Sequence, residues 1–407
     1  MVRLSELALV LTSPGVFILP PLRMDVALQA YVDGTYASVP PSVCEDVDKG
    51  KHSLLELIKN LGTYLTSDNE VVRARAIALL SCVIEHLASQ RADHTHVQLR
   101  RQTIRTLTEF FSSKISDAVI VGDIVSQRAN DAPVVPATAP RAAIKAEEDR
   151  TLRADQMLYD CLRTLLVLSS VGFEENEARS RDAFGGEDAR TAAKALFSLD
   201  LRKYPQPLRF VVGQLLDALV TRHLTALASM RTGPDAPDGS AFVHGYATLV
   251  TGEKDPRNLL LLFGLARVLL LEWDMGPKEA DAMYNILFCY FPISFRPPPD
   301  DPYGITPDQL KKALRACLSA SSKFAPMAYP LLLEKLSATG GSSKIDTLQT
   351  ISACLPVYGR AAAIEHGSDL WTYLQLDILQ PTDEQIIPFA QDTLTAFLRV
   401  ICTDQWE

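Results

Sequence analysis

The segment from His52 to Ser89 contains two apolar stripes at helical spacing, separated by a short polar break. The first stripe consists of Leu54, Leu57, Ile58, Leu61 and Leu65, and the second of Val72, Ala76, Leu79, Leu80, Val83 and Leu87. This spacing predicts two amphipathic helices joined by a tight turn, with Asp68 or Asn69 as the cap of the second helix. A single helix pair cannot bury both of its faces, so it must stack on neighbouring pairs.

Similar apolar stripes recur along the chain at uneven intervals. Single stripes begin at Ile104, Leu158, Leu208 and Leu259, and further pairs occupy residues 329–355 and 370–401. In the first pair, the acidic turn followed by Val72-Arg73 resembles the start of the second helix of a HEAT repeat. We therefore predict an all-α fold, an α-α superhelix of the HEAT/ARM-like solenoid class, built from helix pairs of about 30 to 40 residues. A globular helical bundle is the alternative.

Composition agrees with a helical chain and excludes several classes of partner. Aromatic residues make up 7% of the sequence, whereas Leu and Ala are common, which favours helices over a β-sandwich or barrel. The 40 basic and 49 acidic residues give a net charge of −9. A protein that binds duplex DNA needs a basic surface, so we expect no direct nucleic-acid ligand. No apolar run approaches the roughly 20 residues of a membrane span, so we expect no membrane partner.

The order of apolar and irregular segments divides the chain into four parts. Residues 1–30 are expected to form an irregular leader. A HEAT-like solenoid is predicted for residues 31–290, with flexible insertions near 126–150, 174–190 and 231–258, where prolines, glycines and charges replace the stripes. A proline-rich connector at 291–307 leads to further HEAT-like repeats at 308–407.

The proline-rich run is the most unusual stretch of the sequence. Residues 289–306 contain five prolines, which exclude a regular helix and favour a stiff, extended segment. It ends at Thr306-Pro307-Asp308-Gln309, where Thr306 and Gln309 can form a capping box around the first turn of a helix. We interpret the run as a spacer between two halves of the solenoid, in preference to an exposed recognition strip.

Short motifs that could carry chemistry are few. His94 and His96 lie close together in a polar loop, but this pair lacks the further ligands that a metal site requires. Arg100, Arg101 and Arg105 could attract an acidic peptide, although a solvated helix face is the favoured interpretation.

Signatures of phosphate binding and catalysis are missing from the sequence. The runs at 252–254 and 340–344 lack the glycine spacing and the preceding strand of a phosphate-binding loop. There is no nucleophile elbow and no HExxH motif. The seven cysteines include no CxxC pair and each is predicted to stand alone on its own helix, so we expect reduced thiols and no bound iron or zinc. We predict that the chain is not an enzyme and has no catalytic residues, cofactor, metal or small-molecule substrate.

Two further segments carry a family resemblance, and the proline-rich one is the specific part of it. The first runs from Phe288-Cys289-Tyr290-Phe291-Pro292 to Thr306 and continues with Leu310, Leu314, Cys317 and Leu318. The second is Pro330-Leu331-Leu332-Leu333-Glu334-Lys335-Leu336, followed by Lys344-Ile345-Asp346-Thr347-Leu348-Gln349. With Tyr31-Val32-Asp33-Gly34 and the pair at 52–89, they resemble the amino-terminal domain of the methyl-methanesulfonate-sensitivity DNA repair and transcription protein family. Members of this family are HEAT-repeat targeting subunits of the cytosolic iron–sulfur assembly machinery.

The resemblance implies a function that the residues alone do not. It implies a non-catalytic adaptor that helps to deliver iron–sulfur clusters to apoproteins of DNA replication, repair and transcription. The implied partners are the targeting subunits of the assembly machinery and apo iron–sulfur proteins such as DNA helicases and polymerases, in cytoplasm and nucleus. The alternative is a general HEAT-repeat scaffold, such as a transport receptor or a phosphatase regulator.

Length is the main departure from this family, whose members are much longer and carry further carboxy-terminal HEAT repeats. We predict a last helix over 388–402 and expect it to leave apolar surface open, because a solenoid ends on a repeat with a polar outer face. The chain is therefore expected to be a truncated solenoid that folds, frays at its last helix pair and cannot by itself bind the cluster-loading subunits.

Overall fold

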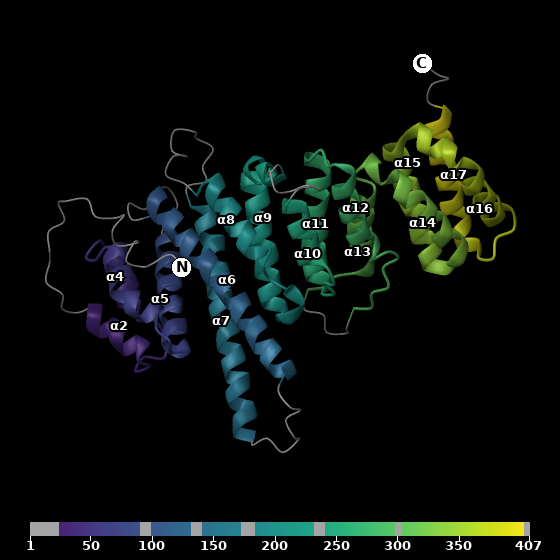
Figure 1. Ribbon diagram of the computed structural model, residues 1–407. Helices are drawn as coiled ribbons and strands as arrows, with labels where there is room; N and C mark the ends of the chain where they lie inside the picture. Colours follow the sequence, from purple (N-terminus) through teal and green to yellow (C-terminus); the bar gives the residue numbers. More distant parts are fainter. Residues whose placement is uncertain are drawn as a thin grey trace. The chain divides into compact units, whose positions relative to one another are not determined.

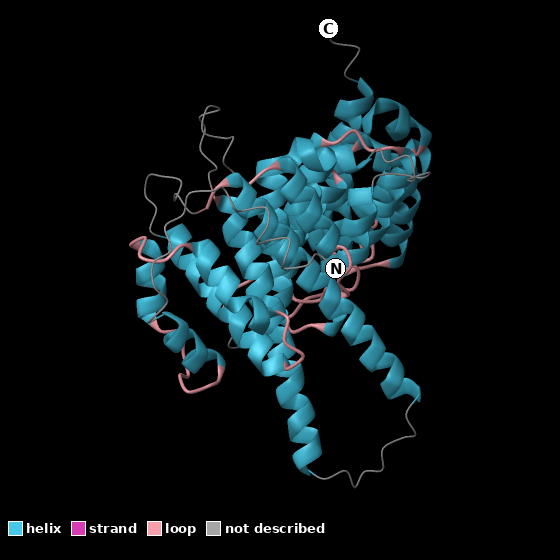
Figure 2. Ribbon diagram, turned by 60° about the vertical axis from the view of Figure 1, so that its left-hand side comes forward, coloured by secondary structure: helices cyan, strands magenta, loops and turns pink. Residues whose placement is uncertain are grey.

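The computed structural model describes residues 24–89, 99–131, 141–171, 184–231, 241–297 and 303–402. In these ranges the chain consists of α-helices, short 3-10 helices and loops, without a β-strand (Figures 1 and 2). The predicted all-α class is therefore confirmed. No helix in this part of the chain has both the length and the apolar character needed to cross a membrane. The chain divides into two compact units, Met1–Leu227 and Ala228–Glu407.

The helix pair predicted for residues 52–89 is present as α4 (Leu54–Leu65) and α5 (Glu70–Ser89). The Ser53 hydroxyl accepts a hydrogen bond from the Glu56 amide at the start of α4. The Asn69 side chain accepts one from the Val71 amide at 3.0 Å, so Asn69 rather than Asp68 caps α5. All five apolar positions predicted for the first helix are buried. Local spacing and capping therefore account for this pair.

The first unit stacks its helices in pairs. Its other helices are α2 (Met24–Val32), α3 (Pro41–Asp48), α6 (Arg101–Asp131), α7 (Arg141–Ser170), α8 (Gly186–Leu196), η2 (Leu201–Lys203) and α9 (Gln206–Ala228). α3 packs against α5, α5 against α7, and α6 against α8. Helices that are two apart in sequence become neighbours when successive pairs stack in the same orientation, so this contact pattern is that of a solenoid.

The second unit repeats the same pattern. Its helices are η3 (Ser229–Arg231), α10 (Ala241–Val250), α11 (Pro256–Glu272), α12 (Pro277–Phe288), α13 (Pro307–Leu318), η4 (Ser322–Phe324), α14 (Ala325–Ala338), α15 (Gly341–Glu365), α16 (Gly367–Leu379), η5 (Glu384–Ile386) and α17 (Ile387–Cys402). α10 packs on α12 and α14 on α16, while α11, α13, α15 and α17 form a continuous second row. Each unit, taken by itself, is thus a stack of helix pairs, and the predicted solenoid class is confirmed.

Several segments that were expected to be irregular are helical. α2 begins within the leader expected at residues 1–30 and is helical because Leu28 is buried and the helix packs on α5. The ends of α6 and α7 extend into the insertion expected at 126–150. α10 lies within the insertion expected at 231–258, because Phe242, Val243 and Tyr246 are buried. The expectation is corrected at these positions, while residues 1–23, 132–140, 172–183 and 232–240 lie outside the described residues.

Candidate functional site: the proline-rich connector and its anchors

The proline-rich connector joins α12 to α13, and it lies entirely within the second unit. α12 and α13 also pack directly against each other. The division between the two units falls near residue 227 instead, at the end of α9. The connector is therefore a long link within one stack of helices and not a spacer between two halves of the chain, which corrects the interpretation drawn from its prolines.

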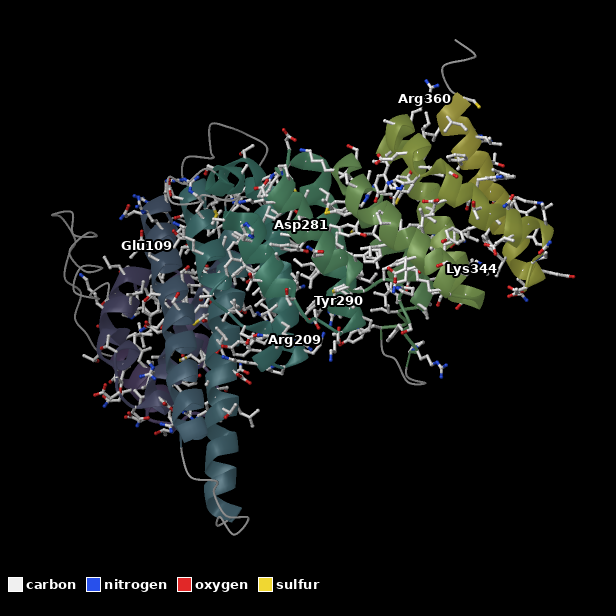
Figure 3. The ribbon with its side chains drawn as sticks, turned by 45° about the vertical axis from the view of Figure 1, so that its right-hand side comes forward. Glu109, Arg209, Asp281, Tyr290, Lys344 and Arg360 are labelled. Atoms are coloured by element: carbon white, nitrogen blue, oxygen red, sulfur yellow. The ribbon has the colours of Figure 1, made fainter. Side chains whose placement is uncertain are left out.

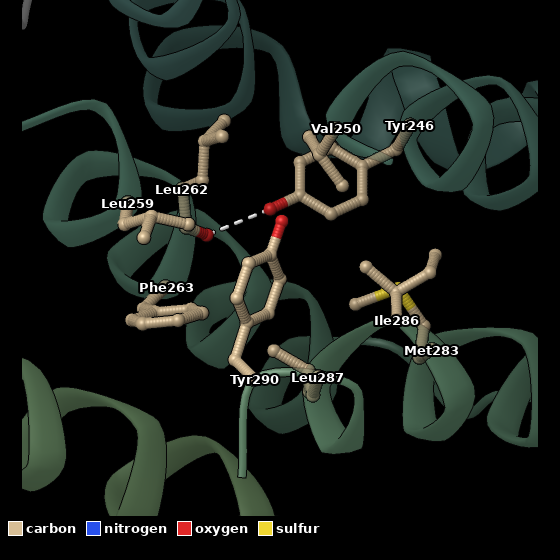
Figure 4. Close-up of a pocket in the computed structure, with 9 residues that line it drawn as sticks. All are labelled: Tyr246, Val250, Leu259, Leu262, Phe263, Met283, Ile286, Leu287 and Tyr290. Carbon is tan, nitrogen blue, oxygen red and sulfur yellow. Dashed lines mark hydrogen bonds between the residues drawn. The ribbon is translucent and has the colours of Figure 1, made fainter. Parts of the chain in front are cut away.

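The upstream end of the connector is fixed by Tyr290 (Figure 4). Its hydroxyl donates a hydrogen bond to the carbonyl oxygen of Glu253 at 2.9 Å, and its ring meets that of Phe263 edge to face at 5.7 Å between centroids. Burial raises the pKa of Tyr290, so the hydroxyl remains a donor. Tyr246 of α10 likewise donates to the carbonyl oxygen of Leu262 at 2.7 Å. Tyr246 thus fastens α11 to α10, and Tyr290 fastens α11 to the upstream end of the connector.

These side chains enclose a small apolar cavity. It is lined by Tyr246, Val250, Leu259, Leu262, Phe263, Met283, Ile286, Leu287 and Tyr290 (Figure 4). Its volume is about 10 Å³, which is room for one water molecule at most. Pockets that bind small molecules enclose about 300 Å³ or more. This cavity is therefore part of the packing that anchors the connector and offers no room for a substrate.

Glu253 holds the loop on which Tyr290 rests. Glu253 is only 4% exposed, and its Oε1 accepts hydrogen bonds from the amides of Lys254 and Asp255 at 2.8 and 2.9 Å. Its Oε2 accepts a hydrogen bond from Nδ2 of Asn258 at 3.0 Å. The amides that a bound phosphate would need are occupied by a carboxylate of the protein, which supports a structural interpretation of this loop.

A row of aromatic rings continues from α12 into the connector. Tyr284 stacks on Phe288 with 5.1 Å between ring centroids, and Phe288 stacks on Phe291 at 5.5 Å. Tyr284 also meets Phe324 of η4 edge to face at 5.3 Å. Aromatic pairs of this kind contribute about 0.5–1.5 kcal/mol each beyond the area they bury. Phe291 thereby ties the first residues of the connector to the core of the second unit.

The downstream end of the connector is fixed as well. Ile305 is buried, and the Arg257 guanidinium lies 4.5 Å from the centroid of the exposed Tyr303 ring. The Thr306 amide donates a hydrogen bond to Oε1 of Gln309 at 2.8 Å. The Gln309 amide donates in return to Oγ1 of Thr306 at 3.3 Å. The predicted capping box is confirmed, and α13 begins at the residue that follows Thr306.

Between its anchors the connector exposes a short strip. Ser294, Arg296 and Pro297 are exposed, and Phe295 is half-buried. Residues 298–302 lie outside the described part of the chain. Residues 291–297 include no His, Cys, Asp or Glu, so this strip offers one cation, a hydroxyl and apolar contacts but no acid–base pair. The exposed side chains of the described strip are thus a hydroxyl, a guanidinium and a proline ring.

In the second segment that carries the family resemblance, residues 330–336 lie on α14 and residues 344–349 lie on α15, where polar side chains link neighbouring helices. Lys344 is labelled in Figure 3. Asp346, which is 3% exposed, accepts a hydrogen bond from the Arg315 guanidinium of α13 at 2.7 Å. Gln349 accepts from the same guanidinium at 2.6 Å, and Lys344 donates to Asp377 of α16. Three helices are therefore joined by partly buried polar contacts. Sequence reasoning missed these roles, because a Lys-x-Asp pattern is ordinary on an exposed helix face.

Of the three arginines predicted to gather at the start of this helix, Arg101 and Arg105 lie on α6 and contact residues of the first unit. Arg105 pairs with Glu109 one turn further along α6, at 3.1 Å. The Arg101 guanidinium lies so close to Gly185 that a Cβ there would be 2.6 Å from it. Arg101 therefore lies where α6 meets α8, and Arg105 lies on the solvated face of α6. Both positions agree with the interpretation of these arginines as part of a helix face and not as a peptide-binding site.

Two cysteines are neighbours, although all seven are free thiols. Sγ of Cys44 on α3 lies 3.8 Å from Sγ of Cys82 on α5. The prediction that every cysteine stands alone is therefore wrong, because the packing of α3 on α5 joins positions 38 residues apart. His94 and His96 lie outside the described residues. Within the residues that are described, no three His, Cys, Asp or Glu side chains are grouped as metal ligands.

Comparison with known families gives a match across both units. A family described as Dos2-interacting transcription regulator of RNA-Pol-II matches residues 58–129 and 148–380. The matched residues include the connector, both of its anchors and the polar segment of α15.

Several curated proteins are similar to this chain. It is 28% identical over 357 residues to the MMS19 nucleotide excision repair protein homolog of Homo sapiens. It is 26% identical over 346 residues to the DNA repair/transcription protein mms19 of Schizosaccharomyces pombe, and 28% identical over 330 residues to a DNA repair/transcription protein of Saccharomyces cerevisiae. The alignments cover 88%, 84% and 81% of this chain, but 29%, 28% and 27% of the relatives. The chain thus spans less than a third of the length of these proteins.

Proposed function

The chain belongs to the MMS19 family, and from this premise we propose that it is a non-catalytic adaptor in cytosolic iron–sulfur protein assembly. In this role it helps to deliver clusters to apoproteins of DNA replication, repair and transcription. Its relatives are named for nucleotide excision repair, DNA repair and transcription, which supports clients that act on DNA. Assembly in the cytoplasm and clients in the nucleus place the proposed activity in both compartments.

The observation that carries this proposal is the structural role of the residues on which the family resemblance is based. Tyr290, Phe291 and Ile305 anchor the connector, and Lys344 and Asp346 tie adjacent helices together. The cavity that Tyr290 lines is too small for a substrate. Residues that hold a stack of helices in register support a role in which the surface of the stack is the functional part, because solenoids present extended binding surfaces.

The proposed mechanism requires no chemistry from this chain. A protein that binds both an apoprotein and the cluster-loading subunits makes their encounter intramolecular and raises the effective concentration of one for the other. The iron–sulfur cluster is then cargo that passes between partners. The adaptor contributes the spacing and orientation of its partners, which depend on the register of the helix stack.

Affinity purification of the tagged chain from its own cells, followed by mass spectrometry, tests this function. We expect to recover the targeting subunits of the assembly machinery or apo iron–sulfur proteins such as helicases and polymerases. Recovery of transport or phosphatase subunits without these proteins would contradict the proposal and support a general scaffold.

The same purification distinguishes a structural connector from a recognition strip. Arg296→Glu changes the exposed charge of the connector, and Lys312→Glu makes the same change at an exposed position of α13. Because both ends of the connector are anchored, we propose that it positions α12 and α13, and we expect both variants to retain the same partners. A partner that is lost only with Arg296→Glu would show that the strip is itself a binding surface.

A further inference from the structure

The contact between Cys44 and Cys82 joins two thiols of unequal exposure. Cys44 is 6% exposed, whereas Cys82 is half-buried, so small solutes reach Cys82 more readily. Their sulfurs are 3.8 Å apart, within the range of a thiol–thiol hydrogen bond. The two residues lie on separate helices, so any bond between them would connect α3 to α5 covalently.

The shared hydrogen bond gives the two sulfurs different roles. Either sulfur can donate this hydrogen bond, and the lower exposure of Cys44 favours Cys44 as the donor, because burial penalises a thiolate. The hydrogen bond to Cys82 and, next, burial raise the pKa of Cys44. Accepting that hydrogen bond lowers the pKa of Cys82, against the opposing influence of its partial burial and of the nearby Glu85 and Asp160 carboxyl groups. Cys82, the more exposed of the two sulfurs, is therefore the one that forms a thiolate more readily, and a thiolate is the reactive form of cysteine.

The other cysteines with perturbed pKa values differ from this pair. Cys161, Cys317 and Cys354 are buried, and burial raises the pKa of each. Cys289 is exposed, but burial of its sulfur raises its pKa, and Sγ donates to the carbonyl oxygen of Ile286 at 2.9 Å. Cys289 therefore provides an internal reference for an accessible thiol outside the pair.

We propose that Cys44 and Cys82 are a redox modification site that exchanges with low-molecular-weight disulfides of the glutathione type. In the first step the Cys82 thiolate attacks one sulfur of the small disulfide, forming a mixed disulfide and releasing one small thiolate. In the second step Cys44, losing its proton to solvent, attacks Sγ of Cys82, forms the Cys44–Cys82 bond and releases the second small thiolate. The protein dithiol is oxidised by two electrons, and one small disulfide is reduced to two thiols.

The consequence of the bond follows from the elements that it connects. A disulfide requires a sulfur–sulfur distance of about 2.05 Å, so the two sulfurs must approach from 3.8 Å by side-chain rotation and a small shift of α3 on α5. The link would close a loop that contains α4 and the turn before α5. Such a link restricts the unfolded chain and stabilises the fold that is compatible with it. Oxidation would thus lock the first helix pairs of the first unit.

The test uses the full chain and oxidised glutathione as the probe. After incubation, free thiols are alkylated and the protein is digested without reduction and analysed by mass spectrometry. We expect a linked peptide pair that contains Cys44 and Cys82, while Cys289 gives at most a mixed disulfide with glutathione. We also expect the midpoint of thermal unfolding, followed by circular dichroism, to rise by several degrees on oxidation and to return on reduction.

Two variants keep the proposal open to refutation. Cys44→Ala should stop the reaction at the mixed disulfide on Cys82 and slow alkylation of Cys82 several-fold at pH 7, because the hydrogen-bond donor is lost. Cys82→Ser should leave Cys44 reduced, and circular dichroism of both variants shows whether they are folded. The proposal is overturned if Cys82 of the wild type stays reduced, or if it only accumulates the mixed disulfide at the rate of Cys289.

Discussion

Two helix contacts, that of α13 with α15 in the second unit and that of α5 with α7 in the first, are held together by different means. In the second unit, buried polar groups link neighbouring helices: Asp346 contacts Arg315, and Tyr358 donates to the carbonyl oxygen of Leu318 at 2.8 Å. In the first unit, α5 meets α7 across a seam of buried aliphatic side chains, and the ion pair over that seam, Arg163 with Glu85, is half exposed. The contact between α13 and α15 is therefore more sensitive to the loss of a single polar partner than the contact between α5 and α7.

The physical reason is that apolar and polar contacts differ in how strictly they depend on geometry and on exclusion of water. Apolar contacts are not directional, so an aliphatic seam tolerates small shifts of one helix along another. A buried charged side chain needs its oppositely charged partner nearby. A buried ion pair therefore favours one register of the two helices, and removal of either member is costly. The three tryptophans of the chain, at 273, 371 and 406, all belong to the second unit. Tryptophan fluorescence thus reports unfolding of the second unit, whereas far-UV circular dichroism reports both.

The largest expected effect comes from breaking the polar link between α13 and α15. Asp346→Ala leaves the Arg315 guanidinium without its carboxylate partner and should lower the free energy of unfolding of the second unit by about 3–5 kcal/mol. Urea unfolding followed by tryptophan fluorescence measures this loss. Glu85→Ala removes the surface pair of the first unit and should cost less than about 1 kcal/mol. Equal losses of stability in the two variants would contradict the expected difference between the α13–α15 contact and the α5–α7 contact.

A pH effect is expected in the first unit. Burial raises the pKa of Asp160 from 3.8 to about 6, so the folded state keeps a proton that the unfolded state has released. Stability of this unit should therefore fall as the pH rises from about 4 to 6. Asp160→Asn should remove that fall and gain roughly 1–2 kcal/mol at pH 8, after allowance for partial exposure, with no gain below pH 4. A gain seen in tryptophan fluorescence but not in circular dichroism would contradict this assignment.

A smaller effect tests whether backbone geometry also sets the register of the second unit. Gly359 has a φ of +85° at the kink of α15, where an alanine is strained even though no neighbouring atom is within 4 Å of its Cβ. Gly359→Ala should cost about 1–2 kcal/mol. Gly264 lies within α11, also with open space around it, and Gly264→Ala should instead stabilise by about 0.5–1 kcal/mol. If both substitutions changed the free energy of unfolding in the same direction, the positive φ at the kink would have no measurable effect on stability.

The smallest expected effect concerns the anchor of the connector. Tyr290→Phe deletes the hydrogen bond to the Glu253 carbonyl and should cost about 1 kcal/mol in the second unit. Tyr36→Phe, at a tyrosine of the first unit that is 49% exposed, should change stability by less than about 0.5 kcal/mol. Hydrogen exchange of the residues around Glu253 should quicken in the first variant. Unchanged exchange there would show that ring packing alone holds the connector.

Much of the fold followed from local pattern. The stripe from Leu54 to Leu65, the capping box at Thr306 and the last helix, predicted at 388–402 and found as Ile387–Cys402, depend on residues within one or two helical turns. Helical spacing and capping act over that range, so a single sequence contains the information. The short helix α10 was missed because strong turn signals just before it were read as one long loop.

The partners across helices were decided only by the tertiary structure. The neighbours Cys44 and Cys82, and Arg315 and Asp346, are separated by 38 and 31 residues. Each pair meets because two helices stack in one particular register, and that register results from the summed packing of many side chains. The spacing of residues along a helix shows which face is apolar, but it does not identify the residue of another helix that will pack against a given position. The sequence by itself determined which segments are helices and which faces are apolar, whereas the positions of the thiol pair and of the buried charges required the packed stack.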